Sequence, residues 1–293
     1  MKTMGVLDKT KPWLDFSSLS LFMRCPRAYW WRHVQHIDKI KKDALVNGEA
    51  YHHAKAIYYQ SKMKGMSHDD SKTVARLSMI DIMNRIIEPE PKHTLACAQD
   101  TIAKYLDLWK DEMYQTIEVE VGFAVDLVNL IFIGKIDRIV NSPMGIFIEE
   151  TKTTSIVGNR WADRLKPNLQ IDGYVAGYYL NTGVMPSAIL DVIPIHEDAR
   201  KRKPPFRYIT VRDEQDIDRW IKCIQQWWEV MSTTKYPMNT ESCAPLVGYS
   251  CDYSQLCNMH PTIDICEAFE IPEIYQRSIW TPFELNPFAE ESN

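Results

Sequence analysis

Two hydrophobic runs near the middle of the chain flank a cluster of turn-forming residues. The runs are VNLIFIGKIDRIV and IFIEETKT, and NSPMG at 141–145 lies between them. Runs rich in Ile, Phe and Val that are separated by Asn, Ser, Pro and Gly are typical of a β-hairpin. With a turn near Pro143, this hairpin would bring Asp137 opposite Glu149 or Glu150. Directly opposed Cβ atoms lie about 5 Å apart, so we expect carboxylates to meet here.

The remaining pattern predicts an alternation of strands and helices. Alternating apolar and polar residues predict strands over 117–127, 187–195 and 206–211. Apolar residues three and four positions apart, with Ser or Pro at the starts, predict helices. The helices cover 17–34 in two segments, 46–65, 69–115 with a break around 88–93, 169–182, and 213–232.

A chain of 293 residues can bury a sizeable core as one large α/β domain. We therefore expect a single domain over 1–293. Its parts are a helical lobe at 45–115, a sheet core at 116–212, a C-terminal helix with cysteines at 213–267, and a tail at 268–293. The Pro, aromatic and acidic residues of the tail suit either partial disorder or the binding of a protein partner.

Composition narrows the class of protein. Hydrophobic residues make up 45% of the chain and charged residues 25%, which is ordinary for a soluble globular protein. The N-terminal residues lack the apolar stretch of a signal peptide, and no apolar run reaches 18 residues, so we expect a cytoplasmic location and no membrane contact. The net charge of −5 does not indicate general nucleic-acid binding, so any such role requires a local groove.

The predicted hairpin carries candidate catalytic residues. Because side chains alternate along a strand, Glu150 and Lys152 share one face and Glu149 points to the other. Two carboxylates that approach closely repel each other unless a cation lies between them, and oxygen ligands suit Mg²⁺ or Mn²⁺. Asp137 and Glu150 therefore form either a divalent-metal site or a surface ladder of ion pairs.

Two helical spacings add candidate residues. Gly48 precedes His52 by four positions, so one helical face carries both and the small residue leaves room beside the imidazole, while His53 points elsewhere. Gln170 and Tyr174 are also one turn apart. Each spacing by itself also fits ordinary packing.

The seven cysteines divide into a set of four and three isolated residues. A disulfide framework is unexpected in a reducing compartment, which leaves metal binding or burial. Cys243, Cys251 and Cys257 have gaps of seven and five residues, whereas zinc sites favour gaps of two to four. Cys25 lies at a predicted helix start, where the helix dipole favours a thiolate. Cys97, Cys223 and Cys266 indicate that isolated thiols also occur in this chain.

Taken in order, these motifs resemble those of a known family. Six motifs follow one another along the chain: the string SxxxxFxxCPRAYWWRHV, GxxxH, Asp137, the ExK motif at Glu150-Thr151-Lys152, QxxxY, and the C-terminal cysteines. This order resembles the RecB-family nucleases of the PD-(D/E)XK superfamily, including the AddB type and the iron–sulfur nucleases of CRISPR adaptation. The resemblance implies a restriction-endonuclease-like fold, in which a mixed sheet is flanked by helices.

The resemblance also implies roles for individual residues. His52, Asp137, Glu150 and the backbone carbonyl of Thr151 would hold one or two Mg²⁺ or Mn²⁺ ions. Lys152 would orient or help to deprotonate the attacking water. The pair Gln170 and Tyr174 would position the DNA strand or support that lysine. Glu120, where the family often has an acidic residue, is either part of this site or a glutamate on the solvent face of a strand.

In the iron–sulfur branch of the family, three C-terminal cysteines and one N-terminal cysteine hold a [4Fe–4S] cluster. Here that set is Cys25, Cys243, Cys251 and Cys257, and the cluster would tie the two chain ends together. The gap between Cys243 and Cys251 is longer than the two-residue gap common in that branch.

The expected function is that of a metal-dependent DNA exonuclease that acts on single strands or duplex ends. The expected settings are recombination, repair or phage DNA processing, with a possible protein partner. The alternatives are a nuclease subunit of a CRISPR-adaptation or restriction complex, and a DNA-end-binding module with an idle site. A basic stretch suits either a solvated loop or contacts with phosphates; it comprises Arg200, Lys201, Arg202, Lys203 and Arg207.

Overall fold

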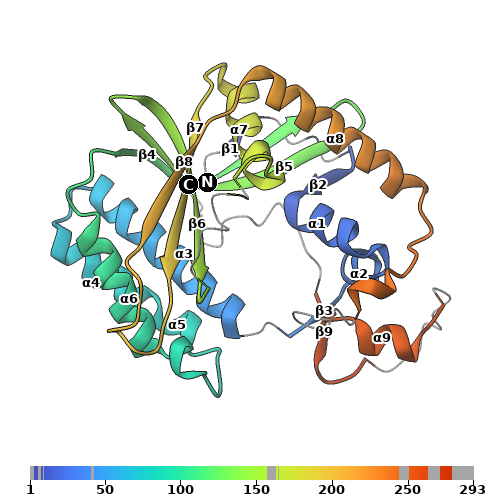
Figure 1. The fold of residues 1–293 in the computed structure, drawn as a ribbon, viewed down its shortest axis with the longest axis horizontal. Coiled ribbons are helices and arrows are strands. Elements are labelled where there is room, and N and C mark those ends of the chain that lie inside the picture. The colour runs from blue at the N-terminus through green and yellow to red at the C-terminus, as the bar shows by residue number, and fades with distance from the viewer. Residues whose placement is uncertain are drawn as a thin grey trace.

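A mixed seven-stranded β-sheet forms the centre of the protein (Figure 1). The computed structural model describes residues 3–5, 8, 10–40, 43–156, 163, 165–243, 251–262 and 271–278. The strand order is β1-β4-β5-β6-β7-β8, and β2 pairs with β5. Neighbouring strands from β4 to β8 are antiparallel, except that β6 and β7 are parallel. The strands are β1 (Thr3–Met4), β2 (Trp13–Asp15), β4 (Gln115–Asp126), β5 (Ile131–Ser142), β6 (Gly145–Thr154), β7 (Ser187–Pro194) and β8 (Phe206–Thr210).

The hairpin predicted from the two hydrophobic runs is formed by β5 and β6. Arg138 pairs with Glu149 and Ser142 pairs with Gly145. Gly145 has a φ of +109°, a conformation that a residue with a Cβ rarely adopts, so the glycine permits this tight turn. The register brings Asp137 opposite Glu150, which is the second of the two predicted alternatives.

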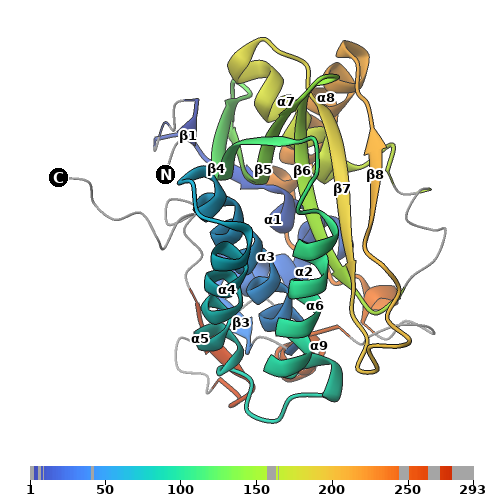
Figure 2. The same ribbon diagram turned by 90° about the vertical axis from the view of Figure 1, so that its left-hand side faces the viewer.

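Helices cover the sheet on both sides, as predicted for the fold class. A lobe of four helices packs on one side, and α1, α7 and α8 lie on the other (Figures 1 and 2). The predicted helix break near residue 90 is present as a short 3₁₀ turn, but a second break after Ser78 divides the preceding helix in two. The helices of the lobe are α3 (Asp43–Met63), α4 (His68–Ser78), α5 (Ile80–Met83) and α6 (Leu95–Leu108).

The main core lies between the sheet, α7 (Leu169–Thr182) and α8 (Glu214–Thr233). Phe132 stacks edge-on against the buried ring of Trp220, with ring centroids 4.9 Å apart. A Cβ at Gly177 would lie 2.4 Å from the ring of Phe123, so only glycine lets α7 approach the sheet this closely. In the described part of the chain, no helix combines the length and apolar character needed to cross a membrane.

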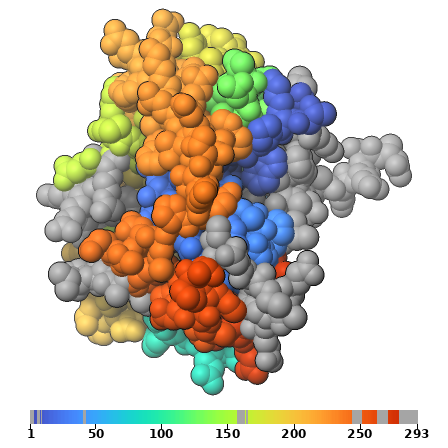
Figure 3. All heavy atoms as spheres, turned by 90° about the vertical axis from the view of Figure 1, so that its right-hand side faces the viewer, coloured from blue at the N-terminus to red at the C-terminus, as the bar shows by residue number. Residues whose placement is uncertain are grey.

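The N-terminal and C-terminal segments meet in a smaller module. Strand β3 (Ile37–Lys39) pairs with β9 (Tyr275–Arg277), and the short helix α9 (Ser254–Met259) packs beside them. Trp30 and Trp31 are buried here. Helix α1 (Phe16–Arg24) and the short α2 (Pro26–Tyr29) lead into this module. Figure 3 shows this face, where α9 in red-orange lies below the orange residues of α8.

Candidate active site

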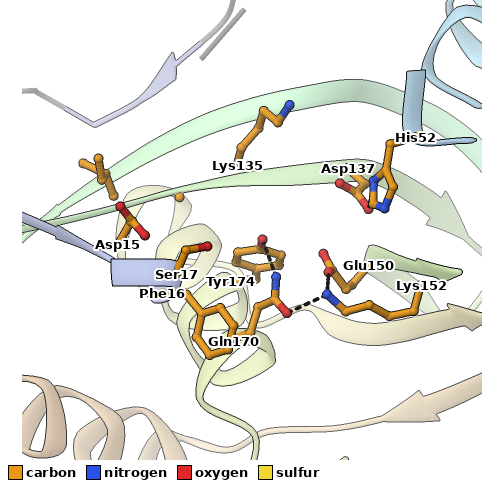
Figure 4. Close-up of a pocket in the computed structure, with 12 residues that line it drawn as sticks. Asp15, Phe16, Ser17, His52, Lys135, Asp137, Glu150, Lys152, Gln170 and Tyr174 are labelled. Atoms are coloured by element: carbon orange, nitrogen blue, oxygen red, sulfur yellow. Dashed lines mark hydrogen bonds and ion pairs between the residues drawn. The ribbon is translucent and has the colours of Figure 1, made fainter. Parts of the chain in front are cut away.

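A pocket of about 300 Å³ opens where β5, β6, α3 and α7 approach one another. Six of the residues singled out in the sequence line this pocket or its edge (Figure 4). They come from segments that are far apart along the chain: His52 from α3, Asp137 from β5, Glu150 and Lys152 from β6, and Gln170 and Tyr174 from α7.

Asp137 is held from two sides. Its Oδ2 lies 3.2 Å from Nδ1 of His52 and accepts a 2.8 Å hydrogen bond from the backbone N–H of Thr151. Burial by itself raises the pKa of the Asp137 carboxyl, but His52 and the Thr151 amide outweigh burial and hold that pKa well below its usual range. Burial lowers the pKa of His52, and Asp137 outweighs burial to give a net increase. The site therefore favours positive charge beside Asp137.

Lys152 belongs to a chain of polar contacts on the opposite side of the pocket (Figure 4). Its Nζ pairs with Glu150 and donates a 2.9 Å hydrogen bond to Oε1 of Gln170. Gln170 in turn donates to the hydroxyl of Tyr174 at 2.9 Å. Burial lowers the pKa of Lys152, but the Glu150 carboxylate outweighs it and raises that pKa. Lys152 is thus an oriented ammonium group at the edge of the pocket.

Glu120 joins the site, although sequence reasoning left its role open. Its carboxylate, His52 and Asp137 each offer a ligand atom within 4.8 Å of the others. Glu120 also has a φ of +55°, which is unfavourable for a residue with a Cβ, and such strain is typical of functional sites. Burial raises the pKa of Glu120 and Asp137 adds to this effect, while Lys135, its ion-pair partner, opposes it.

The donor set fits a divalent cation. Two carboxylates and an imidazole within 4.8 Å of one another match the ligands that Mn²⁺ and Mg²⁺ accept. Burial raises the pKa of Glu150, and the nearby Asp137 carboxylate adds to this increase. A cation among these carboxylates would relieve their repulsion.

A buried ion network behind the pocket was not predicted. Lys55 lies one helical turn after His52, and its Nζ contacts Glu149 Oε1 at 2.6 Å, Asp191 Oδ2 at 2.6 Å and Thr151 Oγ1 at 2.7 Å. Arg138 and Arg207 supply further positive charge to the same carboxylates and to Glu112. The network ties α3 to β6 and β7, and so fixes His52 relative to Thr151.

The basic stretch at 200–207 is only partly a solvated loop. Arg200 is 91% exposed, as such a loop predicts. In contrast, the side chains of Arg202 and Arg207 are each 7% exposed; the first pairs with Asp100 and the second belongs to the buried network. Neither arginine is free to contact DNA phosphates, because ion pairing within the fold holds both.

The four proposed cluster cysteines gather in and beside the module in which β3 pairs with β9. Cys25 and Cys257 are buried, and their sulfurs accept N–H hydrogen bonds from Asn239 at 3.4 Å and Trp31 at 3.3 Å. The backbone N–H of Cys251 donates to the carbonyl of Cys243 at 3.1 Å. Among the described residues, no three cysteine sulfurs lie within 4.8 Å of one another. Cys97 and Cys223 lie elsewhere, on α6 and α8, and Cys266 falls outside the described residues.

Comparison with known proteins identifies the family. A family model for the PD-(D/E)XK nuclease superfamily matches residues 14–258, so the chain belongs to that superfamily. A crystal structure from Eubacterium rectale, described as a "Putative exonuclease", has a similar fold, with a TM-score of 0.51 and 13% identity over 86% of this chain and 98% of that one. A structure named SSO0001 is 14% identical over 74% of this chain and 88% of its own, with a TM-score of 0.30. No functionally curated protein sequence matches the chain.

Proposed function

We propose that this protein is a Mg²⁺- or Mn²⁺-dependent deoxyribonuclease that removes nucleotides from DNA ends. The observation that carries the proposal is the convergence of His52, Glu120 and Asp137, whose ligand atoms lie within 4.8 Å of one another. An oriented Lys152 completes the pocket. Membership of the nuclease superfamily supports phosphodiester hydrolysis, and the description of the Eubacterium rectale protein is consistent with action at strand ends. Recombination, repair and phage DNA processing are the proposed settings.

The proposed ligands are the side chains of His52, Asp137 and Glu150 and the backbone carbonyl of Thr151, with Glu120 as an addition. A divalent ion bound there supplies charge neutralisation at the phosphate and makes water more acidic. Asp137 keeps its carboxylate charged at neutral pH, because its pKa is depressed. Asp137 therefore does not need to lose a proton before it binds a cation.

Lys152 is proposed to act on the reacting phosphate. In the hydrolysis, a water oxygen bonds to phosphorus, the bond from phosphorus to the leaving sugar oxygen breaks, and a proton moves from the water to the leaving oxygen by way of solvent. The Lys152 ammonium can orient the water and offset the negative charge that develops on the phosphate. Gln170 and Tyr174 are positioning residues, since they hold Lys152 through successive hydrogen bonds.

End-labelled linear DNA and closed circular DNA, each incubated with purified protein and Mn²⁺, test the proposal. Degradation of the linear DNA alone, and its loss when EDTA removes the metal, are the expected results. Nicking of circles, or cleavage only with added protein partners, would instead indicate a subunit of a CRISPR-adaptation or restriction complex. Binding of ends without cleavage would indicate a DNA-end-binding module with an idle site.

Substitution of His52 tests the metal ligands. We expect His52→Ala to raise the Mn²⁺ concentration needed for half-maximal cleavage by roughly 10- to 100-fold, the range seen even for weaker perturbations of metal sites. His53→Ala is the matched control, because His53 lies outside the metal-ligand group. A metal titration of cleavage rates is the measurement, and the same metal dependence in both variants would remove His52 from the site.

We also propose that Cys25, Cys243, Cys251 and Cys257 hold a [4Fe–4S] cluster. Hydrogen bonds to sulfur, like those that Cys25 and Cys257 accept, are among the contacts that tune such clusters. The proposed role is structural, because the cluster would join the N-terminal helices to α9.

Iron analysis tests the cluster. Anaerobically purified protein should be brown and contain about four irons per chain. Because the cluster would hold the chain ends together, Cys25→Ser should lower iron content and melting temperature together. Cys97→Ser and Cys223→Ser are the controls and should retain iron. A colourless protein with one tightly bound zinc would contradict the cluster and leave the nuclease proposal standing.

A further inference from the structure

A second cavity, of about 470 Å³, lies beside the metal site between the end of α3 and the start of β4. None of the motif residues or proposed catalytic residues lines this cavity. We call it the α3–β4 groove and define it by Tyr58, Tyr59, Lys62, Trp109, Lys110 and Tyr114. Aromatic rings interleaved with lysines are the side chains by which proteins hold single-stranded nucleic acid.

Two hydrogen-bond donors in the lining lack partners. The hydroxyl of Tyr59 and Nε1 of Trp109 are both buried, and neither has a hydrogen-bond partner among the described residues. Tyr59 is only 5% exposed, so water cannot freely satisfy its hydroxyl. An unsatisfied buried donor is unfavourable, and a ligand rich in acceptors could satisfy it.

The charge of the groove favours an anionic ligand. Lys62 is exposed, and the side chain of Lys110 is 52% exposed, with a long 4.0 Å ion pair to the exposed Asp111. The carboxylate in the lining, that of Glu112, has one oxygen paired with Arg138 and the other with Arg207. The groove therefore offers ammonium groups and N–H and O–H donors, while its carboxylate is already neutralised.

The groove lies next to the proposed metal site, separated from it by buried side chains. Tyr59 and Arg138 line both the groove and a small cavity that is also lined by His52 and Asp137. Along α3, Tyr59 and Lys62 follow His52 by seven and ten residues, which is about 10–15 Å at the rise of a helix. A strand of B-form duplex DNA advances about 3.4 Å per nucleotide, and on that scale this distance corresponds to roughly three to five nucleotides.

We propose that the α3–β4 groove binds a nucleotide of the same DNA strand, three to five positions from the phosphodiester in the metal site. The rings of Trp109 and Tyr114 would contact the base, and Lys62 and Lys110 would contact the flanking phosphates. This inference rests on the proposed nuclease function. It adds a second point of attachment that would keep the strand bound as its end is shortened.

Binding of fluorescent single-stranded oligonucleotides of three to twelve nucleotides, with Ca²⁺ in place of Mg²⁺ or Mn²⁺, tests the groove. Wild-type affinity should rise sharply once an oligonucleotide is long enough to reach it. Lys62→Ala/Lys110→Ala should lose this rise and weaken binding of the longest oligonucleotide by about tenfold. The slope of log affinity against log salt should fall by about 1.4, since each phosphate contact on a single strand contributes about 0.7.

Lys104→Ala/Lys222→Ala is the matched control, because neither lysine lines the groove. It should keep both the affinity and the salt slope of the wild type. Separately, 5-iodouracil placed three to five nucleotides from the bound end should photocrosslink to Trp109 or Tyr114. An unchanged length dependence in the Lys62/Lys110 variant, or crosslinks confined to other residues, would overturn the inference while leaving the nuclease proposal intact. A wild-type protein that binds no DNA would overturn both.

Discussion

Asp137→Asn should abolish DNA cleavage and leave the fold intact. The substitution removes the charge that pairs with His52, while an amide oxygen can still accept the hydrogen bond from the Thr151 amide. A divalent cation needs the carboxylate for tight binding. Loss of the cation would remove charge neutralisation at the phosphate, so we expect the cleavage rate to decrease by about 10³-fold or more. Mn²⁺ affinity should fall in parallel, as measured by calorimetry.

Asp126→Asn provides the matched control for this prediction. Asp126 lies on β4, its side chain is 54% exposed, and neither it nor its ion-pair partner Lys11 lines the pocket. This variant should cleave DNA at the wild-type rate. Near-normal turnover by Asp137→Asn, with metal binding retained, would show that Asp137 is not a metal ligand.

The hairpin could be predicted because residues close together in the sequence determine it. Turn residues between two strand-like runs fix the connection, and a period of two fixes which side chains share a face. Only the exact register was open, and the pairing of Arg138 with Glu149 determines it. The helix carrying Gln170 and Tyr174 was likewise predictable, since Gly183, with a φ of +74°, ends it as its position in the sequence indicates.

The role of Glu120 could not be predicted from the strand pattern. A strand pattern assigns each residue to one face or the other, but it contains no signal for a residue whose φ is +55°. That conformation departs from regular strand geometry at the point where Glu120 meets His52 and Asp137. Only the register between β4 and β5, which is a property of the folded sheet, brings these groups together.

The basic stretch illustrates a second limit. Sequence proximity makes Arg202 and Arg207 look like parts of one exposed charge cluster. Their partners, Asp100 and Glu112, are about one hundred residues away and belong to the helical lobe and the segment that follows it. Long-range pairing of this kind cannot be deduced from local composition. The same is true of the α3–β4 groove, because its aromatic residues come from separate segments.

Glu149 and Glu150 are adjacent in sequence, but we expect their substitution to affect different properties. Glu149 is fully buried and pairs with Lys55, Arg138 and Arg207. Burial raises the pKa of Glu149, but Lys55 and the arginines outweigh it and lower that pKa to about 2. The carboxylate is therefore charged at neutral pH and balances the buried cations.

Glu149→Ala should consequently destabilise the fold. Removing one partner of a buried ion pair costs about 3–5 kcal/mol, because the remaining charges lose their compensation. For a chain of this size, we expect the melting temperature to fall by roughly 10 °C. Glu150→Ala should instead abolish cleavage with a smaller fall in melting temperature, because relief of repulsion with Asp137 offsets the loss of the ion pair with the partly exposed Lys152. Thermal unfolding, together with cleavage rates measured well below the melting temperature, separates the two effects. Equal loss of activity in both variants without any difference in melting temperature would contradict this division between the two faces of β6.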